Sequence, residues 1–370
     1  MLEYIFITFI VLICIQLFYY LFIFSSFSFS KKESSKNSKN NLPISVLVCA
    51  KNEAENLTKN IPFYLQQKYP NFELVFINDR STDDTLEILK KFKKENPTKI
   101  TIVDVKPNEQ FWGSKKYALT LGIKAATNEH LLFTDADCKP VSKHWITTMA
   151  RNFNQEKIII LGYGAYEKIK GSFLNKLIRF ETILTAIQYF SYAKLGIPYM
   201  GVGRNLAYTK SLFFNASGFS SHMNIKSGDD DLFINQVATK ENTISCCSDE
   251  GFTESISKRT FKEWIQQKRR HVGTASHYKG LHQFLLGLFY SSQLLYLIFG
   301  IVLLSFLFQW KIVLLFLILR MIVQFIVVGA AAKKLQENDL ILLAPFFEIF
   351  LVFTQMFIFI KNLITKPTHW

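Results

Sequence analysis

Two carboxylates separated by one residue follow an apolar run at residues 131–137, where the sequence reads LLFTDAD. The apolar residues have the character of a buried parallel strand, and side chains two apart on a strand point the same way. Asp135 and Asp137 are therefore expected to converge at the carboxyl end of that strand. They would repel each other unless a divalent cation lay between them. A lone Asp-x-Asp is equally compatible with a solvated loop, so the surrounding elements must decide.

Strands and helices alternate around this pair. We predict strands at 44–50, 72–79, 99–105 and 130–137. We predict helices at 54–67, 82–95 (capped by Thr82 or Asp83) and 115–126. This order is typical of an open α/β sheet, mostly parallel, whose ligands bind beyond the carboxyl ends of the strands. Polar clusters follow three of the strands (CAKNEAENL, INDRSTDDT and TDADCKP), and together they suit a nucleotide with a metal ion.

Hydrophobic residues make up 49% of the 370 residues, and 36 of them are phenylalanine. The excess is localised. Residues 4–24 carry no charge, have no basic segment before them and lack a small-residue cleavage site, so we predict a retained transmembrane anchor. We predict about three further spans near the C-terminus, at 284–308, 312–332 and 340–360.

The second and third of these C-terminal stretches contain one full charge each, Arg320 and Glu348. A charge in hydrocarbon normally faces protein or water. Antiparallel spans would bring the two charges to comparable depth, and we predict a pair that locks the spans together. The alternative is that each side chain reaches separately toward a headgroup layer.

Lysine and arginine flank the anchor and the first C-terminal span, which predicts a multi-pass protein of the inner (plasma) membrane with its catalytic domain in the cytoplasm. The net charge of +14 would also suit nucleic acid, but there is no nucleic-acid motif and the basic residues gather at the membrane flanks. We therefore predict contact with membrane lipids and no nucleic-acid partner. The five cysteines show no zinc spacing and are predicted to be free thiols.

The predicted organisation is a transmembrane anchor, a basic linker, a catalytic domain, an interfacial linker, a transmembrane region and a tail, at residues 1–27, 28–42, 43–270, 271–283, 284–361 and 362–370. A long, mostly apolar helix at 173–196 is predicted to be interfacial and to bring a lipid-linked acceptor to the site.

The order of these motifs over residues 43–270 resembles the membrane-bound family 2 glycosyltransferases, nucleotide-sugar transferases of the GT-A fold that include the cellulose, chitin and hyaluronan synthases. INDRSTDDT resembles the family's Asp-Asp-x-Ser-x-Asp-x-Thr element, with Asn78 in place of the commoner first aspartate. FTDAD resembles its metal-binding Asp-x-Asp, and QQKRRH resembles its Gln-x-x-Arg-Trp motif, with His271 in place of tryptophan.

The resemblance assigns Asp135 and Asp137 to Mg²⁺ or Mn²⁺. It assigns the nucleotide-sugar to Ala50, Asn52, Glu53, Asp79, Lys115, Asp135, Gln267 and Arg270. Arg204 and Asn205, in the segment PYMGVGRNLAYTK, fall where the family places the acceptor.

The acidic triplet SGDDDLF resembles the region that carries the catalytic base. Crowded carboxylates raise one another's pKa, so one of them could be tuned as a base. Aligning Leu232 with the family's leucine favours Asp229, whereas aligning the acidic pair favours Asp230. We favour Asp230.

These features predict an inverting glycosyltransferase that moves a sugar from a nucleotide-sugar to a lipid-linked or glycan acceptor. One alternative is a processive polysaccharide synthase that exports its product, although His271 and the small number of spans oppose it. A catalytically degenerate protein that only binds nucleotide or lipid is a second alternative, and the intact acidic residues and Lys115 argue against it.

Overall fold

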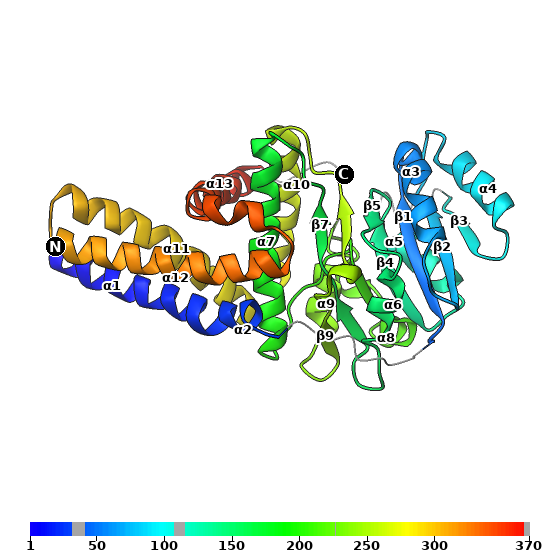
Figure 1. Cartoon of the computed structure of the whole chain (residues 1–370), viewed down its shortest axis with the longest axis horizontal. Coiled ribbons are helices and arrows are strands. Elements are labelled where there is room, and N and C mark those ends of the chain that lie inside the picture. The colour runs from blue at the N-terminus through cyan, green and yellow to red at the C-terminus, as the bar shows by residue number, and fades with distance from the viewer. Residues whose placement is uncertain (32–40, 107–114, 226, 366–370) are drawn as a thin grey trace. The chain divides into compact units, whose positions relative to one another are not determined.

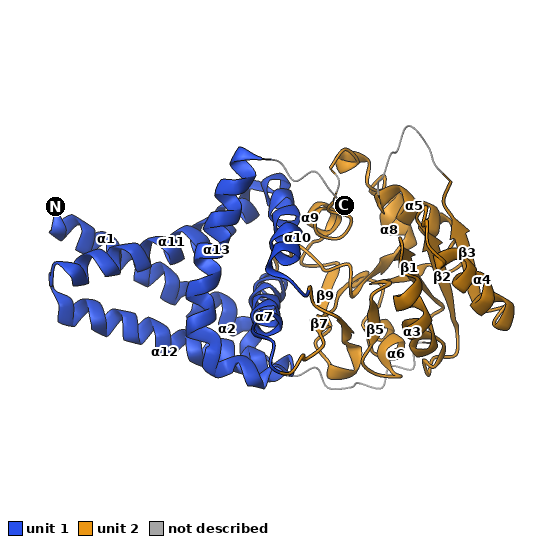
Figure 2. Cartoon of the chain, turned by 90° about the horizontal axis from the view of Figure 1, so that it is seen from above, with its two compact units in different colours: residues 1–31, 171–195, 259–369 blue, residues 32–170, 196–258, 370 orange. Residues whose placement is uncertain are grey.

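The computed structural model describes residues 1–31, 41–106, 115–225 and 227–365, so most of the predicted linker at 28–42 and of the tail lies outside it. The chain forms two compact units, coloured separately in Figure 2. The helical unit comprises 1–31, 171–195 and 259–369, and the sheet unit comprises 32–170 and 196–258.

The sheet unit is built on a seven-stranded sheet in the order β3-β2-β1-β4-β8-β6-β9. Its strands are β1 (Ile44–Ala50), β2 (Phe72–Asn78), β3 (Ile100–Asp104), β4 (His130–Asp135), β6 (Ile159–Leu161), β8 (Leu206–Thr209) and β9 (Thr243–Ser245). The first four strands are parallel to one another, and only β8 runs antiparallel to its neighbours β4 and β6. The prediction of a mostly parallel sheet is therefore confirmed.

Helices alternate with the first four strands, as Figure 1 shows. They are α3 (Ala54–Leu65), α4 (Thr85–Glu95) and α5 (Lys115–Ala125). The unit also contains α6 (Trp145–Ala150), α8 (Lys210–Asn215) and α9 (Asp231–Val237). A second sheet joins β5 (Cys138–Pro140), β10 (Thr253–Ser255) and β7 (Gly164–Tyr166), in that order.

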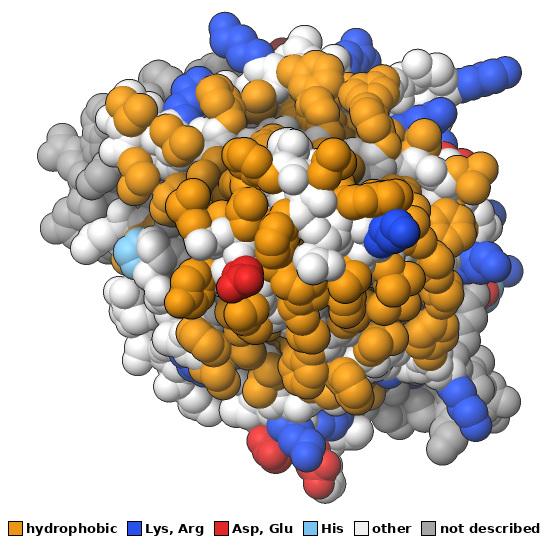
Figure 3. All heavy atoms as spheres, turned by 90° about the vertical axis from the view of Figure 1, so that its left-hand side faces the viewer, with side chains coloured by type: hydrophobic (Ala, Val, Ile, Leu, Met, Phe, Trp, Pro, Cys, Tyr) orange, Lys and Arg blue, Asp and Glu red, His pale blue; other side chains and the backbone are white. Residues whose placement is uncertain are grey.

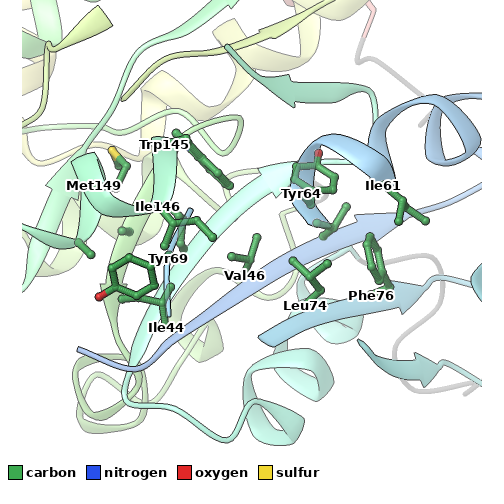
Figure 4. Packing of buried hydrophobic residues seen from close by; sticks show 14 of the residues in the cluster. Ile44, Val46, Ile61, Tyr64, Tyr69, Leu74, Phe76, Trp145, Ile146 and Met149 are labelled. Carbon is green, nitrogen blue, oxygen red and sulfur yellow. The ribbon is translucent and has the colours of Figure 1, made fainter. Parts of the chain in front are cut away.

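The core of the sheet unit lies between the first strands and helices α3 and α6 (Figure 4). Val46, Leu74 and Phe76 project from the strands onto Ile61 and Tyr64 of α3, and all five side chains are fully buried. Each buried side chain of this size contributes about 2 kcal/mol relative to exposure. Because strand β1 is buried along almost its whole length, its sequence ISVLVCA lacks the polar alternation of a one-sided strand.

The predicted cap of the second helix is wrong. Helix α4 begins at Thr85, and Asp84 occupies the N-cap position without a side-chain cap bond. The Asp83 carboxylate instead accepts the Thr85 N–H (3.1 Å) and the Ala54 N–H at the start of α3 (3.2 Å). The Asp83 carboxylate thus joins the loops after β1 and β2 at the sheet edge, and it does not occupy the N-cap position of α4.

The helical unit contains four helical segments that are long and apolar enough to cross a membrane, one near the N-terminus and three near the C-terminus. The first, Leu2–Ser28, combines α1 (Leu2–Phe18), η1 (Tyr19–Phe24) and α2 (Ser25–Ser28). The others are α11 (Gly280–Ser305), α12 (Trp310–Lys334), and η6 (Asn338–Leu343) with α13 (Ala344–Ile364). The face in Figure 3 is covered largely by hydrophobic side chains. The predicted arrangement of one anchor and three later spans is confirmed.

Two further helices, α7 (Phe173–Lys194) and α10 (Phe261–Thr274), pack within the helical unit, although α7 falls inside the predicted domain at 43–270 and α10 begins inside it. Arg179 on α7 is buried and pairs with Glu337 and Asp339 beside η6. Glu181 on α7 accepts a bond from Trp264 of α10 (3.0 Å). The compact units therefore do not follow the predicted boundaries, since sequence continuity does not decide where a helix packs.

The predicted pairing of the two intramembrane charges is confirmed. The Arg320 guanidinium donates to both oxygens of Glu348, at 2.5 and 2.6 Å, and both residues are almost fully buried. The first and second spans join the pair, because Gln16 accepts from Arg320 (2.8 Å) and Gln293 donates to Glu348 (2.5 Å). Tyr20 donates to the same carboxylate (2.8 Å). All four spans thus meet at one polar cluster, which we call the charge cluster.

The charge cluster predicts coupled effects on stability. Arg320→Ala and Glu348→Ala should each destabilise the protein by roughly 3–5 kcal/mol, because each leaves an uncompensated buried charge. The double variant should cost clearly less than the sum. Thermal unfolding in detergent measures the three variants, with Lys311→Ala, an exposed residue of α12, as the control. Strict additivity would show that the two charges do not interact.

Candidate functional site

The carboxyl ends of β1, β2 and β4 place the predicted site residues along one sheet edge. Strand register puts Asp135, the last residue of β4, beside Cys49 of β1, and Ala50 beside Asn78 of β2. Asp137 follows in the turn that leads into β5. The arrangement fits the rule that ligands of open parallel sheets bind beyond the carboxyl ends of the strands.

Two side chains of helix α3 donate hydrogen bonds to the backbone around Asp137. The Asn60 amide donates to the Ala136 carbonyl (2.9 Å), and the Tyr64 hydroxyl donates to the Cys138 carbonyl. Asn60 and Tyr64 are both buried, so these backbone carbonyls are held without water. The acidic turn is therefore held rigidly before any ligand binds.

Asp135, Asp137 and Cys138 each offer a ligand atom within 4.8 Å of the others. Burial and the neighbouring Asp135 raise the pKa of the Asp137 carboxyl. Burial also raises the pKa of the Cys138 thiol well above its usual range, so this thiol stays protonated and donates to Asp137 (3.4 Å). The remaining donors are carboxylate oxygens, which are the ligands that Mg²⁺ and Mn²⁺ prefer. The residues thus fit the predicted metal.

Lys115, at the start of α5, lies between carboxylates from two parts of the chain. Its ammonium is 2.9 Å from an oxygen of Asp135 and 3.0 Å from an oxygen of Asp229. These two carboxylates raise the pKa of Lys115 well above its usual range, so the side chain stays charged. A cavity of about 20 Å³, room for roughly one water molecule, lies among these groups.

Asp230 occupies the N-cap of α9 and accepts two backbone N–H groups, from Gly203 (2.6 Å) and Asp231 (2.8 Å). Burial, followed by repulsion from Asp229 and Asp231, nevertheless raises the pKa of Asp230 to about 7. A carboxylate with this pKa is half-ionised near neutrality, which suits a general base. Gly203 matters because a Cβ there would lie 3.2 Å from the Asp230 oxygen.

The polar residues after β1 and β2 hold each other in place. Asn52 has a left-handed φ of 58°, and its side-chain oxygen accepts the Thr82 N–H (2.8 Å). The Ala50 carbonyl accepts the Asp79 N–H (2.8 Å). Asp79 is only 4% exposed, and Arg80 donates two bonds to it. Their predicted contacts with a nucleotide-sugar stay predictions.

Glu53 stands close to the acidic pair. Burial raises the pKa of its carboxyl, and the charges of Asp137 and Asp135 raise it further. Its carboxylate also accepts a bond from Asn56 (2.6 Å). The charges of the predicted metal ligands thus act on a third carboxylate, in the loop after β1.

Arg204 and Asn205 differ sharply in their surroundings. Asn205 is fully buried, accepts from Trp145 (3.1 Å) and donates to the carbonyls of Tyr163 and Gly251. We therefore assign Asn205 a structural role, in place of the predicted acceptor contact. Arg204 is partly exposed and stacks on the ring of Tyr166 at 4.2 Å. It stays a candidate for binding substrate.

Gln267 and Arg270 lie on α10, which belongs to the helical unit. The site residues described above belong to the sheet unit. Their assignment to the nucleotide-sugar stays a prediction.

Sequence reasoning missed Cys49 and Lys116. Cys49 lines the small cavity, and burial raises the pKa of its thiol to about 12, so it is neutral there. The Lys116 side chain is buried and donates to the carbonyls of His222 (2.7 Å) and Ile225 (2.9 Å), in the segment before the acidic triplet. Burial lowers the pKa of Lys116 to about 8. Only its position beside Lys115 hinted at a role.

Comparison with known proteins agrees with this architecture. Residues 45–221 match the family model described as "Glycosyl transferase family 2". Over 94 residues the chain is 38% identical to the poly-beta-1,6-N-acetyl-D-glucosamine synthase of Staphylococcus epidermidis. The aligned segment covers 25% of this chain and 21% of that protein. The enzyme of the same name from Staphylococcus aureus strain COL is 34% identical over 94 residues, with the same coverage. The chain thus aligns with about a fifth of the length of these relatives.

Among solved structures, the mannosyltransferase PcManGT from Pyrobaculum calidifontis, in complex with GDP-Man and Mn²⁺, superposes with a TM-score of 0.61 at 16% identity. The match covers 91% of this chain and 99% of that chain. It establishes the shared GT-A fold with flanking helices.

The acidic pair predicts a divalent-metal site that depends on Asp137. Asp137→Asn should weaken Mn²⁺ binding roughly 10-fold or more, since even residues that only orient a metal ligand contribute this much. Electron paramagnetic resonance of free Mn²⁺, with and without a nucleoside diphosphate, measures the affinity. Glu156→Gln, an exposed change in the same unit, is the control. Equal affinity in the Asp137 variant and the unaltered protein would contradict the assignment.

Proposed function

Residues 45–221 form a family 2 glycosyltransferase domain, and from this premise we propose that the protein transfers a sugar, with inversion, from a nucleotide-sugar to a lipid-linked or glycan acceptor. We place the reaction at the cytoplasmic face of the inner membrane, because the basic residues flank the spans on that side of the predicted topology. The observation that carries the proposal is the convergence of Asp135, Lys115, Asp229 and Asp230 at one strand edge.

The leaving group of such a reaction is a nucleoside diphosphate, which gains negative charge as the bond to the sugar breaks. A divalent ion held by Asp135 and Asp137 would supply electrostatic stabilisation of that charge. Lys115 supports the same role: its ammonium is held at the edge by two carboxylates and stays charged. Beside a bound metal ion, the Lys115 ammonium would add to the positive charge available to a phosphate at this edge, in a partly buried setting where charges interact more strongly than in water.

The acceptor hydroxyl must lose its proton as it attacks. We assign this step to Asp230, whose raised pKa of about 7 lets it accept a proton near neutrality. The acceptor oxygen then forms a bond to the anomeric carbon while the bond to the diphosphate breaks. Attack opposite the leaving group inverts the configuration at that carbon.

A processive polysaccharide synthase is the second candidate. The names of the staphylococcal relatives favour it, since both are synthases of an N-acetylglucosamine polymer. The shared segment is only 94 residues long, and His271 stands where processive synthases of the family carry tryptophan. We therefore favour transfer to a single acceptor, and the length of the product distinguishes the two.

The proposed activity is tested with the full chain in lipid bilayers. Incubation with a panel of nucleotide-sugars, including UDP-N-acetylglucosamine and GDP-mannose, should release a nucleoside diphosphate from at least one donor. Release should depend on added Mn²⁺ or Mg²⁺ and stop in excess chelator. Mass spectrometry of the lipid fraction would then show whether one sugar or a polymer is added. No release from any donor, with lipid extracts supplied as acceptors, would contradict the proposal.

The assignment of the base predicts both a rate loss and a pH profile. Asp230→Asn should lower turnover roughly 100-fold or more while nucleotide binding persists. Because only the deprotonated carboxylate accepts a proton, kcat/KM of the unaltered protein should rise as the pH rises through about 7 and level off above it. Initial rates from pH 5 to 9, with titration calorimetry of the nucleotide, measure both.

Asp231→Asn is the matched control for the base, and Asp229→Asn tests the other candidate of the triplet. Asp231 repels Asp230, so the Asp231 variant should stay active and its profile should move to lower pH. If all three single variants keep near-normal turnover, the base lies elsewhere.

A further inference from the structure

Within the helical unit, α10 and α13 line an open apolar groove of about 420 Å³ that no part of the proposed reaction uses. Six of its lining residues lie on α13: Phe346, Ile349, Phe350, Phe353, Thr354 and Phe357. Ile265 supplies the α10 side, and Thr354 is the only polar lining residue. Helix α13 belongs to a segment that is long and apolar enough to cross a membrane. The groove therefore has the size and the apolar lining of a ligand site, on a helix apolar enough to lie in hydrocarbon.

One end of the groove carries two cations. The Lys361 ammonium lies 5.6 Å from the centre of the Phe357 ring, which lines the groove. Arg269 follows the groove residue Ile265 by one helical turn of α10 and donates to Asn362 of α13 (2.8 Å). Among the residues that the structure describes, the Nη1 group of Arg269 has no hydrogen-bond partner. A basic end on an apolar groove is complementary to an anionic headgroup on a hydrocarbon chain.

We propose that this groove binds one membrane lipid with a phosphate headgroup, the chain lying along the phenylalanines of α13 and the phosphate at Arg269 and Lys361. The commitment to a lipid rests on two observations together: the lining is almost wholly apolar, and Lys361 of α13 and Arg269 of α10 lie at one end of it. A free phosphate would contact the two cations but would leave the apolar lining uncovered.

The helices that form the groove are fixed to each other at that end, so the site is preformed. Besides Asn362, Arg269 also donates to Thr365, and the Asn362 amide returns a bond to the Arg269 carbonyl (3.0 Å). Helix α10 is held at its other end by a capping box between Thr260 and Glu263. A preformed site loses less entropy on binding, which favours one bound lipid over loosely ordered boundary lipid.

The test uses the full chain in detergent, without nucleotide, so that it does not depend on the proposed activity. Native mass spectrometry measures retention of phosphatidic acid and of diacylglycerol with the same chains. Phosphatidic acid should bind roughly 10-fold more tightly, which is the order expected of charge-assisted hydrogen bonds. The combined change Arg269→Gln and Lys361→Gln should remove that preference. Lys262→Gln, an exposed change on α10, should keep it.

A second variant tests the groove itself. Ile349→Trp adds bulk inside the groove and should weaken both lipids, whereas Ile322→Trp, exposed on α12, should not. Equal retention of the two lipids by the unaltered protein would overturn the proposal, as would full competition by inorganic phosphate. A dimer that Ile349→Trp dissociates, with lipid retention unchanged, would assign the groove to a second copy of the chain and also overturn it.

Discussion

Repulsion between carboxylates at one sheet edge is the constraint on which the site depends. Asp135 ends β4 and Asp137 lies in the turn that follows it, and Asp229, in the segment just before α9, reaches the same edge. Buried like charges at such distances raise one another's pKa or require a cation. Lys115 answers part of this need, because it contacts both Asp135 and Asp229, and it links the predicted metal ligands to the acidic triplet that contains the proposed base. In the proposed reaction, the metal site and the base are thus electrostatically coupled through one side chain.

Such a cluster stays assembled only if the backbone beneath it does not relax. The sheet supplies this rigidity, since β1 pairs in register with both β2 and β4 and is buried along most of its length. Buried polar side chains then hold the irregular segments: the Asn60 amide holds the turn that carries Asp137, and the Lys116 Nζ group holds the segment before the triplet. These contacts use backbone carbonyls that would otherwise be unsatisfied in a dry environment. Burial of this part of the sheet unit therefore both stabilises the backbone under the site and raises the pKa of the carboxyl groups of Asp137 and Asp230.

The sequence predicted these features unevenly, for physical reasons. Strands β1 to β4 were predictable because parallel strands covered on both sides are continuous apolar runs, and their polar ends then located Asp135 and Asp137. The pairing of Arg320 with Glu348 was predictable because hydrocarbon offers a charge few other solutions. The sequence predicted an acceptor contact for Asn205, but in the structure this side chain bonds with the Trp145 indole and two backbone carbonyls. A polar residue among glycines and aromatics gives the same sequence pattern in both cases. The packing of α7 and α10 with the spans depends on long-range contacts such as Trp264 with Glu181, which no local pattern encodes.

The helical unit uses charge in two opposite ways, and the difference is one of burial and ion pairing. In the charge cluster, both oxygens of the buried Glu348 accept from Arg320, and residues from the remaining spans join the network, although the Arg320 Nε group has no hydrogen-bond partner among the described residues. A network of this kind fixes which helices pair and at what depth. At the basic end of the groove, by contrast, Lys361 is exposed and Arg269 keeps a free donor among the described residues. A buried ion pair positions the spans, whereas exposed positive charge beside an apolar groove is what an anionic lipid recognises.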